Sequence, residues 1–134
     1  MLLVQQISME RIYVVAVLLL ALSAMEISEA LNFFQKHVVR QMGTGDCNRK
    51  MRKINRNARI CKKINTFFLD PDGELDGICN MQNQTITGIN LRIIACKRRN
   101  RYSPCFYRGI PGRATGVRVI CNQNNRPVHL KDVW

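Results

Sequence analysis

Acidic residues are scarce in this 134-residue chain, which has nine aspartates and glutamates against 21 lysines and arginines and a net charge of +12. Four of the nine acidic residues lie close together, between positions 70 and 76, so the rest of the surface must be strongly positive. Such a surface attracts polyanions, including nucleic acids, anionic glycans and anionic bacterial membranes. The charge alone does not choose among these partners.

The chain also lacks an apolar run long enough to cross a membrane. The segment from Ile12 to Ala24 is almost wholly apolar, but it is shorter than the roughly 20 residues that a spanning helix needs. The basic residue Arg11 precedes it, and small residues ending at Ala30 follow it. This pattern is typical of a secretory signal peptide, with an N-terminal membrane anchor as the alternative. We therefore expect residues 1–30 to be removed and the protein to be secreted and extracellular.

Internal repeats and low-complexity linkers are absent from the remainder, which predicts one domain, residues 31–134. We expect this domain to be a monomer. Removing residues 1–30 takes away one basic and three acidic residues from the totals of 21 and nine. The mature chain would keep 20 basic and six acidic residues, a net charge of +14.

The six cysteines include no CxxC pair, a spacing that would indicate a zinc site, so we expect no metal. All six lie in the predicted mature domain, at Cys47, Cys61, Cys79, Cys96, Cys105 and Cys121. An even number in a small secreted domain predicts three disulfides. Six cysteines allow 15 pairings, so their number and spacing leave the connectivity open.

Helical patterns occupy the first part of this domain. Apolar residues recur at spacings of three to four from Phe33 to Met42, which predicts an amphipathic helix ending near Gly43. Asp46 is a suitable N-cap for a second helix. After a turn or helix start at residues 70–72, a short helix is expected to run up to Cys79.

The later part of the domain is strand-like. Runs of β-branched and aromatic residues bounded by turn residues predict strands within residues 61–68, 91–94, 105–108, 116–121 and 128–130. Helices followed by strands indicate an α+β domain with an antiparallel sheet. Asn83 begins a glycosylation sequon in a polar segment.

The chain has only two histidines, His37 near the start of the predicted domain and His129 near its end. Histidine is the side chain best suited to proton transfer near neutral pH. Two histidines can divide the work, one as base and the other as acid. Taken alone, the pair is weak evidence, because a histidine on an apolar helix is commonly structural.

Three short motifs give these histidines a context. CKKINTF, residues 61–67, resembles the CKxxNTF signature of the pancreatic ribonuclease (ribonuclease A) superfamily. FFQKHV, residues 33–38, resembles its N-terminal helix with the first catalytic histidine, and PVHL, residues 127–130, its C-terminal strand with the second. The resemblance covers essentially all of residues 31–134, and six cysteines rather than eight resemble the angiogenin-like branch.

The resemblance implies a ribonuclease A-like α+β fold, with about three helices packed on a curved antiparallel sheet. It also implies the disulfides Cys47–Cys96, Cys61–Cys105 and Cys79–Cys121.

The resemblance further implies cleavage of single-stranded RNA after pyrimidines, through a 2′,3′-cyclic phosphate and without a metal or cofactor. His37 would take the proton of the ribose 2′-hydroxyl, and His129 would protonate the leaving 5′-oxygen. Lys62 would stabilise negative charge on the phosphoryl oxygens. DNA lacks the 2′-hydroxyl and should not be cleaved.

Four further residues are implied in substrate binding. The backbone N–H of Leu130 would contact the phosphate, and Asn65 would support the site. Thr66 would bind a pyrimidine base, because a hydroxyl both donates and accepts, with strand packing as the alternative. Lys36 replaces a glutamine that is frequent in the family; it would hold a phosphate or remain solvated.

Two further departures lie in the C-terminal part of the chain. Lys131 occupies the position where the family often has an aspartate that orients the second histidine, and Asp132 comes one residue later. In a regular strand this shift points the carboxylate to the opposite face, so we expect His129 to lack its orienting partner. Asn122 replaces a glutamate that some members use at the second base subsite. These differences bear on rate and base preference rather than on reaction type.

Basic residues concentrate in two segments, 49–59 and 97–101. They predict a surface that contacts RNA phosphates, with affinity falling steeply in salt. Two alternatives stay open: a cationic host-defence (antibacterial) protein, and an angiogenin-like signalling ligand with weak nuclease activity that acts on a cell-surface receptor.

Overall fold

The computed structural model describes residue 12 and residues 14–17, 31–80 and 84–134. The chain divides into two units, residues 1–31 and 32–134. Residues 12 and 14–17 of the first unit are helical, and no helix among the described residues has the length and apolar character to cross a membrane. The expected cleavage site after Ala30 and the sequon residue Asn83 lie outside the described residues, so both stay predictions.

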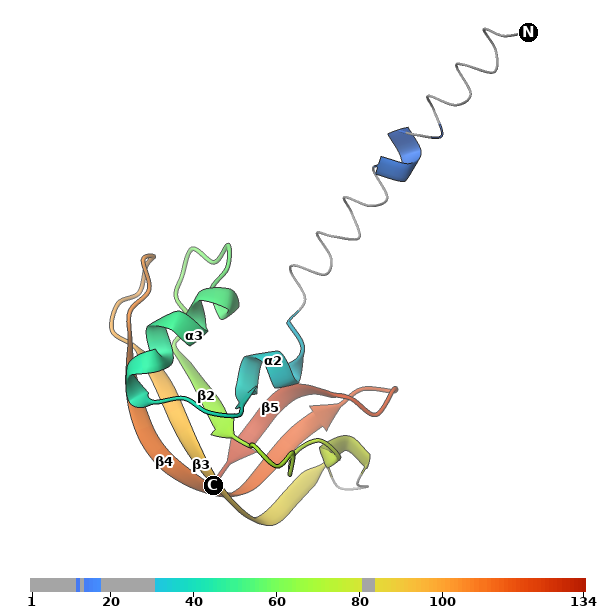
Figure 1. Ribbon diagram of the computed structural model, residues 1–134, viewed down its shortest axis with the longest axis vertical. Helices are drawn as coiled ribbons and strands as arrows, with labels where there is room; N and C mark the ends of the chain where they lie inside the picture. Colours follow the sequence, from blue (N-terminus) through green and yellow to red (C-terminus); the bar gives the residue numbers. More distant parts are fainter. Residues whose placement is uncertain (1–11, 13, 18–30, 81–83) are drawn as a thin grey trace, which may run out of the picture. The chain divides into compact units, whose positions relative to one another are not determined.

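Residues 32–134 contain one five-stranded sheet in the order β1-β2-β3-β4-β5. The strands are Val38–Val39, Ile64–Leu69, Thr85–Arg98, Tyr107–Cys121 and Pro127–Val133. β1 pairs with β2 in parallel, and every other pair is antiparallel. Figure 1 shows that the long strands β3 and β4 bend along their length. The expected α+β fold with a curved, mainly antiparallel sheet is confirmed.

The first helix is shorter than the predicted helix up to Met42. α2 spans Phe33–His37 and begins with a capping box, in which Asn32 and Gln35 exchange side-chain to backbone hydrogen bonds of 2.8 and 3.0 Å. It ends at His37 because the next two residues, both valines, form β1 beside β2. Valine branches at Cβ and favours strands over helices.

The other helices are α3, Cys47–Ile54, and two 3-10 helices, η1 at Thr44–Asp46 and η2 at Ile78–Asn80. α3 starts directly after Asp46 as predicted, but the Asp46 carboxylate accepts its hydrogen bond from the Gly43 N–H, before the helix. The short helix expected before Cys79 is the single turn η2. The buried Asp70 carboxylate shapes the turn before it, accepting the N–H groups of Glu74 and Leu75.

β3 and β4 are both longer than the sequence predicts, and β3 extends well beyond the expected residues 91–94 at both ends. The second half of the strand expected at residues 105–108 and the whole of that expected at 116–121 belong to one 15-residue strand that begins at Tyr107 and pairs with β3 along both parts. The glycines and proline between them, which commonly interrupt strands, remain in the ladder. At Gly109 a side chain would collide with the Thr44 carbonyl oxygen, so glycine lets η1 lie directly against β4.

Two adjacent residues of β2, Phe67 and Phe68, are fully buried and belong to two different core clusters. Successive strand residues point to opposite faces, so β2 has apolar packing on both sides. The Phe68 cluster includes Phe33 of α2 and Val119 of β4, whereas the Phe67 cluster includes Met51 of α3. β2 is therefore held firmly between α2 and α3.

The three disulfides join Cys47 to Cys96, Cys61 to Cys105 and Cys79 to Cys121, the connectivity that the resemblance implies. The bonded cysteines are 49, 44 and 42 residues apart in sequence. In the chain-entropy account, loops of this size stabilise a fold by about 4 kcal/mol each.

Candidate functional site

A hollow of about 340 Å³ contains every catalytic and substrate-binding residue predicted from the sequence. These seven residues are Lys36, His37, Lys62, Asn65, Thr66, His129 and Leu130. They come from α2, from β2 and the segment before it, and from β5. The two ends of the domain sequence therefore meet at one site.

His37, the last residue of α2, is 7% exposed. Its Nδ1 lies 2.9 Å from the backbone oxygen of Thr66. Because a carbonyl can only accept, Nδ1 carries the proton in the neutral ring and Nε2 keeps its lone pair. Burial lowers the pKa of His37 to about 4, the Thr66 bond opposes this, and the charges of Lys62 and Lys36 lower it further. The ring of His37 is thus neutral at neutral pH, with Nε2 unprotonated.

Lys62 and Lys36 are connected through a buried amide. Asn65 is 2% exposed; its Oδ1 accepts from the Lys62 Nζ at 2.8 Å, and its Nδ2 donates to the Lys36 backbone oxygen at 2.8 Å. Burial, and then the charge of Lys36, lower the pKa of Lys62. No carboxylate among the described residues forms an ion pair with Lys62, which leaves its charge available to an anionic substrate.

The backbone of Lys62 is held by two residues, Asn55 and Tyr107, that were not predicted from the sequence. The Lys62 N–H donates to Asn55 Oδ1 at 3.1 Å, and the Tyr107 hydroxyl donates to the Lys62 carbonyl at 2.7 Å. Asn55 Nδ2 in turn donates to the Tyr107 hydroxyl at 2.8 Å. No motif could have identified these residues, because their partner is a main-chain group and Tyr107 is 45 residues away.

The register of β5 places Asp132 differently from the sequence expectation. His129 pairs with Ile120 and Leu130 with Val119, but Arg118 pairs with Asp132, so the intervening lysine is an extra, bulged residue. Arg118 and Ile120 are two residues apart and share the exposed face of β4. Asp132 therefore lies on the same face as His129. The expectation that it points to the opposite face was wrong, because a β-bulge resets the alternation.

On that face, Asp132 Oδ2 lies 3.4 Å from Arg118 Nη1, and both side chains are about half exposed. Such an exposed ion pair contributes about 0–1 kcal/mol. His129 itself is exposed, unlike the buried His37. Lys131 and Asp132 both line the hollow beside it.

The site therefore combines a buried neutral histidine, an exposed histidine and a lysine around one hollow. This combination suits general acid–base catalysis on an anionic substrate. Within the described part of the chain, no group of three or more histidine, cysteine, aspartate or glutamate side chains could hold a metal ion.

Comparison with known proteins gives a consistent picture. The profile of the family described as pancreatic ribonuclease matches residues 28–131. Zebrafish RNase5 has 24% sequence identity and a TM-score of 0.61, and the match covers 75% of this chain and 89% of that one. SS-RNase-2 has 26% identity and a TM-score of 0.60, with coverage of 76% and 95%. A cytotoxic ribonuclease from Rana catesbeiana, solved in complexes with d(ApCpGpA) and (2′,5′CpG), has 23% identity, a TM-score of 0.58 and coverage of 75% and 91%.

Proposed function

The chain belongs to the pancreatic ribonuclease family, and we propose that it is a secreted, metal-independent endoribonuclease that cleaves single-stranded RNA after pyrimidines. The observation that carries the proposal is the meeting of His37, Lys62 and His129 in one hollow, although they come from distant parts of the sequence. Two histidines in different environments provide a base and an acid, and the lysine provides positive charge.

The proposed first step is transphosphorylation within the RNA chain. Nε2 of His37 takes the proton of a ribose 2′-hydroxyl, and the 2′-oxygen attacks the adjacent phosphorus. The bond from phosphorus to the 5′-oxygen breaks as His129 donates a proton to that oxygen. The products are a 2′,3′-cyclic phosphate and a free 5′-hydroxyl. The low pKa of His37 and its bond to Thr66 support its role as the base, since both keep Nε2 unprotonated.

Lys62 has the role of stabilising charge on the phosphoryl oxygens, and the backbone N–H of Leu130 donates to the same group. Removing one preorganised donor of this kind typically costs about 3–4 kcal/mol of barrier, or two to three powers of ten in rate. The hydrogen bond to Asn65 supports this role of Lys62, because it restricts a flexible side chain before substrate arrives.

Thr66 and Lys36 are assigned to substrate binding on the same basis. Thr66 lies in the hollow, and its hydroxyl can both donate to and accept from a pyrimidine edge. Lys36 lies beside His37 and offers an ammonium to a neighbouring phosphate. Replacing Thr66 with valine should reduce cleavage of poly-C and poly-U, with the product ends unchanged.

The direct test is cleavage of poly-C, poly-U and poly-A by the secreted protein, with and without EDTA. We expect cyclic phosphate ends from the two pyrimidine polymers in both conditions. His129→Ala should lose most of this activity, whereas Asn124→Ala, a change at an exposed turn residue before β5 that does not line the hollow, should keep it. Unchanged turnover by His129→Ala would refute the assignment. Sequencing the N-terminus of the same protein tests removal of residues 1–30.

A second function is favoured by the surface of α3, where Arg49, Arg52 and Lys53 are exposed. Together with the excess of basic residues in the sequence, this surface supports a host-defence role in which charge disrupts bacterial membranes. Comparing bacterial killing by the wild type and by His37→Ala separates charge from catalysis. If killing disappears with catalysis while bacterial binding persists, the charge-based role fails.

A further inference from the structure

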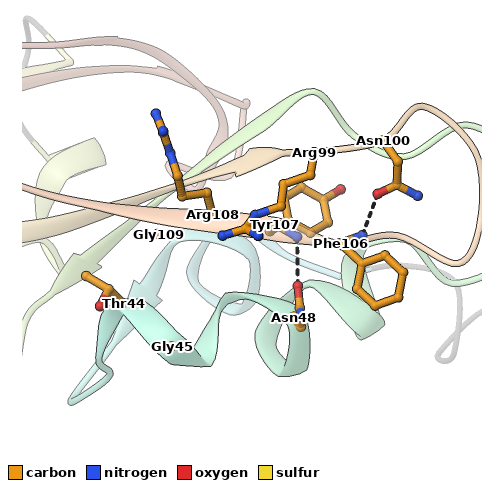
Figure 2. Close-up of a pocket in the computed structure, with 9 residues that line it drawn as sticks. All are labelled: Thr44, Gly45, Asn48, Arg99, Asn100, Phe106, Tyr107, Arg108 and Gly109. Atoms are coloured by element: carbon orange, nitrogen blue, oxygen red, sulfur yellow. Dashed lines mark hydrogen bonds between the residues drawn. The ribbon is translucent and has the colours of Figure 1, made fainter.

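A second groove lies between α3 and the hairpin that joins β3 to β4. One part is a hollow of about 760 Å³, larger than the one with the histidines, and its lining includes Arg99 and Arg108. The other part, of about 390 Å³, adds Arg52 of α3. Both parts are lined by Asn48 and Phe106. We call this the hairpin groove, defined by these five residues. Figure 2 shows its larger part, with Asn48 of α3 bonded to Tyr107, and with Phe106, Arg99 and Arg108 on the hairpin above the helix.

The hairpin groove is positively charged without compensation. No aspartate or glutamate is among the described residues that line its two parts. Arg52, Arg99 and Arg108 are exposed, and they form no side-chain hydrogen bond or ion pair with the described part of the chain. Free guanidinium groups bind phosphate well, because their planar N–H groups match its oxygens.

The groove also exposes an aromatic ring. Phe106 has 51% of its surface exposed. Its backbone N–H donates to Asn100 Oδ1 at 2.8 Å, and Asn100 Nδ2 donates to the carbonyl oxygens of Tyr102 and Pro104. The hairpin loop therefore fixes Phe106 without burying its ring. An exposed aromatic side chain beside arginines is typical of a platform on which nucleic-acid bases stack.

The walls of the groove are fixed in the free protein. The Tyr107 N–H donates to Asn48 Oδ1 at 2.7 Å, which connects the hairpin to α3 (Figure 2). The absence of a side chain at Gly109 lets η1 touch β4 directly. A groove that already has its shape loses little conformational entropy when a ligand binds.

We propose that the hairpin groove binds a second segment of single-stranded RNA outside the cleavage site. Phosphates bind the arginines and a base stacks on Phe106. Only the identity of the polymer as RNA rests on the proposed function. An anionic glycan would use the arginines but would have no planar base to place on the ring, so the exposed aromatic side chain favours nucleic acid.

The test uses a single-stranded oligodeoxynucleotide labelled with 2-aminopurine, which the enzyme should bind but not cleave. Binding is measured by fluorescence at several salt concentrations for the wild type, for Arg99→Ala with Arg108→Ala, and for Phe106→Ala and Phe106→Leu. The matched control, Arg92→Ala with Arg113→Ala, removes two arginines that pair across β3 and β4, at a hollow also lined by acidic residues. Thermal unfolding of each variant checks that it is folded.

We expect both the double groove variant and Phe106→Ala to bind about tenfold more weakly, since one base–aromatic stack is worth about that factor or more. Phe106→Leu should resemble Phe106→Ala, because leucine keeps the bulk but not the stacking face. Losing two phosphate contacts should reduce the slope of log affinity against log salt by about 1.4. The control pair should change affinity by less than about twofold, because it removes charge without direct contacts.

Cleavage of a dinucleotide, which fills only the active site, is the second readout and should be unchanged in all variants. The proposal fails if the groove variants bind the oligonucleotide as tightly as the control pair. Heparin, an anionic glycan, is measured beside the oligonucleotide. The proposal also fails if Phe106→Ala binds both ligands normally while the double variant binds both more weakly, since the occupant is then a glycan. Absence of RNA cleavage by the wild type would instead overturn the proposed function, and the binding comparison would still decide the groove.

Discussion

His37 should make the stability of the folded protein depend on pH between about 4 and 6.5. Burial lowers its pKa from 6.5 to about 4 in the folded state, whereas the unfolded chain exposes the ring and returns the pKa toward 6.5. The unfolded state therefore binds more protons in this interval, and acid favours unfolding. The contribution of His37 to stability is complete above pH 6.5 and is lost as the pH falls toward 4.

The magnitude follows from the two pKa values. They differ by about 2.5, and each unit corresponds to about 1.4 kcal/mol, which gives about 3.5 kcal/mol in total. This figure is an upper value, because the many positive charges of the unfolded chain also lower the pKa of histidine there. Domains are typically stable by about 5–15 kcal/mol, so the loss would be easily measured.

The assay is urea unfolding with the disulfides intact, at intervals from pH 7.5 to pH 3.5, for the wild type, His37→Asn and His37→Gln. Neither replacement titrates, and the carboxylates are common to all three proteins, so their effects cancel in the differences. The free energy of unfolding of the wild type relative to each variant should fall by up to about 3.5 kcal/mol on acidification. Both variants should give the same pH dependence, which is the internal control.

An NMR titration of the His37 ring gives an independent check, with an expected midpoint near pH 4. A midpoint near 6.5, together with a stability difference that does not change with pH, would refute the reasoning. It would mean that water reaches the ring in solution, and that a substantial fraction of His37 is protonated at neutral pH. Burial would then not account for the unprotonated Nε2 that the proposed mechanism requires of His37.

Three further predictions concern residues that support the catalytic hollow or the hairpin groove. Asn65→Ala should lower the free energy of unfolding by about 1–3 kcal/mol, because it removes a buried amide with two partners; urea unfolding measures the loss. Tyr107→Phe should lower kcat for a dinucleotide more than it changes KM, since it releases the Lys62 carbonyl without touching substrate; unchanged kcat would contradict this role. Gly109→Ala should lower the free energy of unfolding by about 1–3 kcal/mol, because the new methyl group collides with the Thr44 carbonyl oxygen. Thermal unfolding measures this as a lower midpoint, and an unshifted midpoint would argue against that contact.

Local sequence signals predicted where the two α-helices of the domain begin better than where the first of them ends. Asp46 marked the start of α3 correctly, because a short polar side chain before an apolar repeat is a local property. The end of α2 depends on a distant partner, since Val38 leaves the helix to pair with Phe68. β4 shows the same dependence: its glycines and proline resemble a break in the sequence, but pairing with β3 keeps the strand continuous through them.

The residues of the candidate site were predictable because each acts through its position in a short motif that can be recognised in the sequence. CKKINTF and the two histidine motifs supplied the seven predicted site residues, and all seven are among the twelve residues that line the hollow. The support for those residues was not predictable in the same way. Asn55 and Tyr107 act on the main chain of Lys62, a group that every residue has, so no residue type marks the contact in the sequence.

The position of Asp132 shows why strand register must accompany a motif. Counting alternate residues from His129 assumes that each step along β5 matches one step along β4, and the bulged Lys131 breaks that assumption. With the register known, Asp132 stands on the face of His129, where it faces Arg118 in a weak, half-exposed ion pair. The extra residue in the motif thus changes the spacing along the chain without moving the carboxylate to the other face. The environment of the second histidine is therefore set by cross-strand pairing with β4 rather than by residue order within β5.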